Sequence, residues 1–128
     1  MYRLSKRSYN RLKGVEPILK DILKEAIKDA PFDFGVAWMG GHRTPAQQYK
    51  LFEKGASKCD GYKRKSYHQS GKAFDIVCYH NGAITWESHI FEMVANHILT
   101  TAKQKFNTRL TWGGNWQNFK DLPHFQLD

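Results

Sequence analysis

Apolar residues recur at helical spacing in two long segments of the chain, 15–28 and 87–105. Each segment places charged residues between the apolar ones, as an amphipathic helix does when one face packs on a core. A third helix is predicted over 44–54, because Thr44-Pro45 provides an N-cap residue followed by proline at the first helical position. The pattern therefore predicts three helices separated by other structure.

Short apolar runs between these helices predict strands. They lie at 34–39, 73–79, 84–86, 108–112 and 124–127. Asn81-Gly82, a pair typical of a two-residue hairpin turn, joins the second run to the third. Because hairpin strands are antiparallel and 128 residues suit one core, we expect a single α+β domain over residues 1–128, with a small antiparallel sheet and flanking helices.

The segment 55–67 is polar and rich in glycine and lysine, which predicts a long loop of the kind that often serves function. It contains Cys59, whereas Cys78 lies in an apolar run and is expected to be buried. The two cysteines form no CxxC pair, so no disulfide is indicated and synthesis in a reducing compartment is expected.

The chain is basic, with 20 Lys and Arg against 12 Asp and Glu and a net charge of +8. Such a charge attracts polyanions: nucleic acid, anionic lipid or a negatively charged cell wall. The basic residues are spread along the whole chain and form no single stripe, which argues against nucleic acid. No apolar run approaches the roughly 20 residues of a membrane span, and the basic N-terminus leads into no signal-peptide core. We expect no stable membrane insertion, and synthesis in the cytoplasm with release through another agent if the substrate lies outside.

Three fragments carry candidate chemistry. They are G-H-R-T-P-A-Q-Q (Gly41–Gln48), S-Y-H-Q-S-G-K-A-F-D (Ser66–Asp75) and D-L-P-H-F (Asp121–Phe125). Catalytic zinc takes three protein ligands, commonly imidazole and carboxylate, and leaves one position for water. His68 before a strand, Asp75 within it and His124 on a neighbouring strand can converge on one ion if Gly71 permits a sharp bend.

Two further residues complete a hydrolytic reaction. Asp121, three residues before His124, can face the water and act as the general base. Arg43 presents a permanent, fork-shaped cation that can bind a substrate carboxylate or the developing oxyanion, and we favour the carboxylate because zinc can already polarise the carbonyl. Spacing alone does not identify the site, since each pair of residues often recurs by chance.

Read together, the three fragments resemble the family of zinc D,D- and L,D-peptidases. The family hallmark S-x-H-x-x-G-x-A-x-D is matched at every fixed position by 66–75, and the later carboxylate-x-x-His by 121–124. An upstream G-x-R-T is matched from Gly41 onward, and a late W-G-G-x-W by 112–116. The short chain and the N-G hairpin make it most similar to the phage endolysin branch, the L-alanyl-D-glutamate peptidases.

The resemblance implies a Hedgehog/D,D-peptidase fold, a zinc cofactor and a peptidoglycan stem peptide as substrate. It implies zinc ligands at His68, Asp75 and His124 and a catalytic base at Asp121, where many members have Glu. Arg43, Ser66 and Trp112 are the expected substrate-binding residues, and the protein is expected to be a monomer.

Other functions remain open at this stage. A D-Ala–D-Ala carboxypeptidase would use the same zinc site with a pocket closed around a free carboxylate. A nucleic-acid-binding or nuclease domain would use the positive charge. A metal-binding module without activity would leave Asp121 idle.

Overall fold

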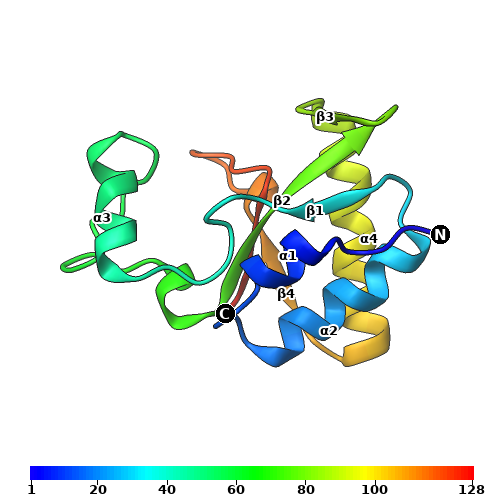
Figure 1. Cartoon of the computed structure of the whole chain (residues 1–128), viewed down its shortest axis with the longest axis horizontal. Helices are drawn as coiled ribbons and strands as arrows, with labels where there is room; N and C mark the ends of the chain where they lie inside the picture. The colour runs from blue at the N-terminus through cyan, green and yellow to red at the C-terminus, as the bar shows by residue number, and fades with distance from the viewer.

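The longest strand, β2 (Ala73–His80), organises the sheet in the computed structural model, which describes all of residues 1–128 (Figure 1). The five strands are antiparallel, with β1, β2, β5 and β4 in that order and β3 paired to β2. The other strands are β1 (Phe34–Val36), β3 (Ala83–Thr85), β4 (Leu110–Trp112) and β5 (His124–Leu127). The Asn81-Gly82 turn has positive φ at both residues, as its hairpin type requires. The α+β class and the hairpin are confirmed.

Helices α2 (Pro17–Ala26) and α4 (Ser88–Phe106) pack against each other and supply most of the helical part of the core. A short 3-10 turn (Ile27–Asp29) extends α2. The alternating residues Phe74, Ile76 and Cys78 of β2 are fully buried in the same core, so one face of the strand packs under the helices. Asp75 therefore points to the other face of the sheet.

Helix α1 (Lys6–Arg11) covers the free edge of β1 and has no counterpart in the sequence-based predictions. Ser5 caps it, and the Ser8 hydroxyl accepts a hydrogen bond from the Val36 amide at 3.0 Å. The Arg11 guanidinium donates to the Val36 carbonyl at 3.0 Å. These contacts satisfy the backbone groups that an edge strand leaves unpaired.

The predicted strand over 34–39 ends early, at Val36, because the chain bulges before Gly40. The Ala37 amide donates to the Asp75 carbonyl at 2.9 Å, and the Asp75 amide donates to the Gly40 carbonyl at 2.8 Å. Met39 takes a positive φ of 58° between them. A β-carbon on Gly40 would lie 2.8 Å from the carbonyl oxygens of Ala37 and Asp75, so glycine is required there. The bulge is thus hydrogen-bonded to both the amide and the carbonyl of Asp75.

Helix α3 (Pro45–Glu53) lies apart from α2 and α4, on the other side of β2 (Figure 1). Thr44 and Gln47 form a reciprocal capping box at its start, which confirms the predicted N-cap. The segment after α3 is irregular until a 3-10 turn at Tyr67–Ser70, as the composition of 55–67 predicted. No helix of the chain is both long and apolar enough to cross a bilayer.

Both cysteines are free. Cys78 is buried as predicted, and its burial raises the pKa of the thiol to about 12. Cys59 is half-buried in the segment after α3. The thiol of Cys78 is therefore a core group with little reactivity.

Candidate metal centre and its cavity

Asp75 and His124 face each other across neighbouring strands. The antiparallel pairing of β2 with β5 sets Asp75 directly opposite His124, and residues so paired have their β-carbons about 5 Å apart. His124 Nδ1 lies 3.1 Å from Asp75 Oδ1. The convergence of these two residues from neighbouring strands, predicted from the sequence, is confirmed.

His68 reaches the same carboxylate from the 3-10 turn before β2. The Ser66 hydroxyl caps this turn by accepting from the His68 amide. Gly71 ends the turn at φ 74°, and a β-carbon there would lie 2.4 Å from the Gly14 carbonyl oxygen. The predicted sharp bend at Gly71 is present. Both the positive φ and the close approach of the Gly14 carbonyl require glycine there. His68 Nε2 then lies 3.2 Å from Asp75 Oδ1, with the imidazole almost wholly buried.

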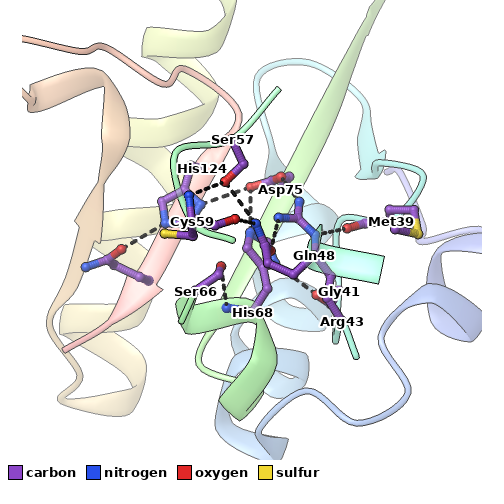
Figure 2. A network of polar contacts seen from close by, with 11 residues as sticks. Met39, Gly41, Arg43, Gln48, Ser57, Cys59, Ser66, His68, Asp75 and His124 are labelled. Carbon is purple, nitrogen blue, oxygen red and sulfur yellow. Dashed lines mark hydrogen bonds and ion pairs between the residues drawn. The ribbon is translucent and has the colours of Figure 1, made fainter. Parts of the chain in front are cut away.

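The remaining ring nitrogens show which atoms are free to bind a cation. His68 Nδ1 donates to the Gly41 carbonyl at 2.9 Å, and His124 Nε2 donates to Gln126 Oε1 at 2.9 Å. The Gln126 amide nitrogen donates to the Asp128 carboxylate at 2.8 Å, which fixes the orientation of the amide. His68 Nε2 and His124 Nδ1 are therefore the ring nitrogens that face Asp75 (Figure 2).

Three electron-pair donors meeting in this way fit a metal ion. The donor atoms of His68, Asp75 and His124 lie within 4.8 Å of one another, and no other group of three such residues occurs in the chain. Lone pairs brought this close repel each other unless a cation or a proton lies between them. Two imidazoles and one carboxylate suit zinc, whereas calcium and magnesium prefer oxygen ligands throughout. The three donor residues therefore fit a transition metal ion such as zinc.

Arg43 holds Asp75 from behind the donor atoms. Its three guanidinium nitrogens donate to Asp75 Oδ2 at 3.1 Å, Gln48 Oε1 at 3.1 Å and the Met39 carbonyl at 2.8 Å (Figure 2). Arg43 is 9% exposed, and its burial lowers the pKa of the guanidinium while Asp75 opposes this. The structure therefore gives the fork of Arg43 protein partners that sequence spacing did not reveal.

The surroundings of the Asp75 carboxyl act on its pKa in opposite directions. Burial disfavours the charge, but hydrogen bonds with His124 and His68 outweigh burial and hold the pKa of Asp75 well below its usual value. A lowered pKa favours the ionised carboxylate, which is the form that would bind a cation.

Asp121 lies beside this group without belonging to it. Its backbone is fixed by a hydrogen bond from its amide to the Gly113 carbonyl at 3.0 Å, and its carbonyl accepts from the His124 amide at 3.2 Å. Burial, followed by the nearby charge of Asp75, raises the pKa of the Asp121 carboxyl. Its carboxylate is thus a half-buried group, separate from the donor atoms of the candidate metal site.

A cavity of about 550 Å³ joins these residues. Its lining includes all the predicted site residues except Trp112: Arg43, Ser66, His68, Asp75, Asp121 and His124. Trp112 is 5% exposed, stacks on Phe125 and donates to the Leu122 carbonyl, so it packs in the core. Trp116, the second tryptophan of the same motif, lines the cavity and lies 5.3 Å from the His124 ring.

The sequence-based reading also missed the groups that orient the ligands, namely the Gly41 carbonyl, Gln48 and Gln126. Gly41 and Gln48 lie within the fragment that was singled out for Arg43, and Gln126 is two residues after His124. Alternation along β5 could have placed Gln126 on the face of His124.

This donor set and fold define a class of protein, a metallopeptidase-like domain with an antiparallel sheet. Residues 1–126 match the family of phage L-alanyl-D-glutamate peptidases, and the chain belongs to that family. The family predicted from the three fragments is confirmed.

Three known proteins show how far the likeness extends. The chain is 29% identical over 124 residues to the peptidoglycan L-alanyl-D-glutamate endopeptidase CwlK of Bacillus subtilis (strain 168), covering 88% of this chain and 73% of that protein. The crystal structure of the Serratia marcescens L-Ala D-Glu endopeptidase ChiX matches with a TM-score of 0.85 and 31% identity, over 99% of this chain and 90% of that one. The LD-carboxypeptidase LdcB shares the fold, with a TM-score of 0.60 and 18% identity over 93% of this chain and 68% of that one.

Proposed function

We propose that this chain is a zinc-dependent peptidoglycan hydrolase that cleaves the amide bond between L-alanine and D-glutamate of the stem peptide. The observation that carries the proposal is the meeting of three cation-binding atoms with a separate carboxylate, Asp121, in one cavity. Family membership and the activities for which CwlK and ChiX are named support the same bond here. The carboxypeptidase alternative has only the fold likeness to LdcB.

In this proposal His68 binds zinc through Nε2, His124 through Nδ1 and Asp75 through its carboxylate. When bound, zinc polarises the scissile carbonyl and lowers the pKa of a water molecule toward neutrality. The chain contributes the orientation of the ligands: the Gly41 carbonyl and Gln126 fix the two imidazoles. Hydrogen bonds of this kind to metal ligands commonly change the metal affinity by about 10- to 100-fold.

Asp121 moves the proton. Its carboxylate takes a proton from the attacking water and later delivers it to the nitrogen of D-glutamate as that nitrogen leaves. A raised pKa suits this role, because the carboxyl must hold the proton between the two transfers. Asp121 therefore acts as base and then as acid.

Arg43 serves best as a positioning residue. Its three guanidinium nitrogens already donate hydrogen bonds to Asp75, Gln48 and the Met39 carbonyl. These contacts support a role in holding Asp75 in place rather than in binding the substrate. Ser66 lines the cavity as it caps the turn of His68, and substrate contact by Ser66 stays a prediction.

The proposal places the protein at the cell wall, where its substrate lies. A net charge of +8 favours association with an anionic envelope. All the proposed catalytic groups come from one chain, so we infer that a monomer suffices.

The test is digestion of purified peptidoglycan, with and without a metal chelator, followed by mass spectrometry. We expect fragments with a new amino terminus at D-glutamate, loss of activity with chelator, and recovery when zinc is added back. Release of free D-alanine would identify a carboxypeptidase. Cleavage of nucleic acid in a parallel digest, with peptidoglycan left intact, would support the nuclease alternative.

A further inference from the structure

Three cationic side chains line the same cavity as Asp121 and the candidate metal ligands. They are Lys58, Arg64 and Lys65, which we call the cationic wall. All three are exposed, and none takes part in an ion pair within the chain. Arg43, by contrast, is occupied by Asp75. The positive charge available to a ligand in this cavity therefore lies in the loop after α3.

The loop that carries the cationic wall is held by directed hydrogen bonds. Asp60 Oδ1 accepts from the backbone amides of Tyr62, Lys63 and Arg64 at 2.9–3.0 Å. The Gly61 amide donates to the Arg64 carbonyl at 3.1 Å, which closes the turn. These bonds hold the backbone of Arg64 in one conformation although its side chain is exposed.

The same loop is tied to the metal centre through two glutamines. Gln48, buried and bonded to Arg43, donates through Nε2 to Ser57 Oγ and the Cys59 carbonyl at 2.9 Å (Figure 2). Gln69, in the turn of His68, donates to the Gly61 carbonyl at 2.9 Å. The loop and the candidate metal ligands thus share supports, which fixes the placement of the wall relative to the site of chemistry.

Lys58 extends the wall toward the other side of the cavity. Its ammonium lies 5.0 Å from the centre of the Phe119 ring, and Phe119 belongs to the segment before Asp121. A cation over an aromatic face is attracted by the negative charge of the ring face. This contact joins the two segments that border the cavity.

The proposed substrate carries a charge that this wall would meet. D-glutamate has two carboxyl groups, and only one can be joined to the next residue of the stem peptide. The other stays free within a few bonds of the nitrogen that leaves. Asp121 must lie beside that nitrogen, and two carboxylates so close would repel each other without a cation nearby.

We propose that the cationic wall, chiefly Arg64 and Lys65, binds this free carboxylate and makes the enzyme select ionised D-glutamate over its amide. This inference rests on the proposed function. A hydrogen bond from a guanidinium or ammonium group to a carboxylate is stronger than one to a neutral amide oxygen. Since the carboxylate is present in both ground and transition states, the preference appears mainly in KM.

The experiment compares two soluble peptides, L-Ala–D-Glu–L-Lys linked through the side-chain carboxyl of D-Glu, and the same peptide with the free carboxyl amidated. For the zinc-loaded wild type we expect kcat/KM to be about tenfold higher on the carboxylate form, roughly the low end for one charge-assisted hydrogen bond. Arg64→Gln and Lys65→Gln should each reduce this ratio, mainly through a higher KM for the carboxylate form, and together bring it close to one.

Lys63→Gln is the matched control, because Lys63 is exposed in the same loop and does not line the cavity. It removes the same charge and should leave the ratio intact. If Lys63→Gln lowers the ratio equally, the preference comes from the overall positive charge of the protein and not from the cationic wall. Equal cleavage of both peptides by the wild type would refute the selection. Cleavage of neither peptide, with intact peptidoglycan also untouched, would instead remove the proposed function.

Discussion

Two adjacent residue pairs on β2 and β5 show how this molecule separates stability from chemistry. Phe74 lies opposite Phe125 and the two rings stack 5.1 Å apart in the core. One residue further along β2, Asp75 lies opposite His124 on the other face, with Nδ1 and Oδ1 3.1 Å apart. Successive side chains of a strand point to opposite faces, so one ladder of backbone hydrogen bonds supports both pairs.

The two faces are stabilised by different forces. The face of β2 that packs against α2 and α4, here called the helix face, is stabilised by apolar burial, which depends little on direction and tolerates substitutions that conserve volume. The metal face uses hydrogen bonds in fixed directions, and no buried side-chain polar atom in the chain lacks a partner. We therefore expect mutations on the helix face to change the free energy of unfolding and those on the metal face to change binding and rate.

The largest effect is expected from removing a candidate zinc ligand. Asp75→Asn keeps the shape and can still accept from Arg43, but it loses the charge that binds a cation. Both Asp75→Asn and His124→Ala should lose stoichiometric zinc and at least about 10³-fold in activity, because metal catalysis contributes several kcal/mol. Elemental analysis and circular dichroism check zinc content and folding. His89→Ala, an exposed histidine on α4, is the control. Full zinc retention by both variants would place the metal elsewhere.

Asp121→Asn separates proton transfer from metal binding. We expect zinc content to be unchanged and kcat to fall by about 10² to 10⁴-fold, the usual contribution of a positioned acid–base group. Steady-state kinetics on a soluble muropeptide and zinc analysis of the same sample check this. Loss of zinc would make Asp121 a ligand, and near-normal kcat would assign the proton to another group.

Phe74→Ala tests the helix face of the same strand. Removing a buried aromatic ring should lower the free energy of unfolding by about 3–5 kcal/mol. Urea denaturation measures the loss, and zinc stoichiometry in the folded fraction should stay near that of the wild type. A loss of zinc without a loss of stability would contradict the separation of the two faces.

The smallest effect is expected from Arg43→Lys, which tests a residue that supports Asp75 without being one of the three candidate ligands. Lysine keeps the charge but cannot reach Asp75, Gln48 and Met39 together. We expect zinc affinity, measured by competition with a chelator, to fall about 10- to 100-fold. Normal zinc affinity with a raised KM would instead assign Arg43 to a substrate carboxylate, as the sequence alone suggested.

Local patterns were sufficient for most of the elements. Helical spacing predicted α2 and α4, the Thr44-Pro45 pair predicted α3, and Asn81-Gly82 predicted the hairpin. These signals lie within a few residues of the elements they specify. Helix α1 was not predicted, because its six residues carry no apolar periodicity. It is fixed by contacts with β1, at residues 25 and 28 positions away in the sequence.

The sequence by itself determined the residue types of the candidate metal site and the bend at Gly71, because the motif 66–75 is contiguous. Only the tertiary structure decided which partners orient them: Arg43 meets Asp75 from 32 residues away, and His124 meets it from 49. It also decided that Trp116 and not Trp112 borders the cavity. The physical reason is that periodicity assigns a residue to a face of its own element, whereas strand register and loop hydrogen bonds decide which faces meet.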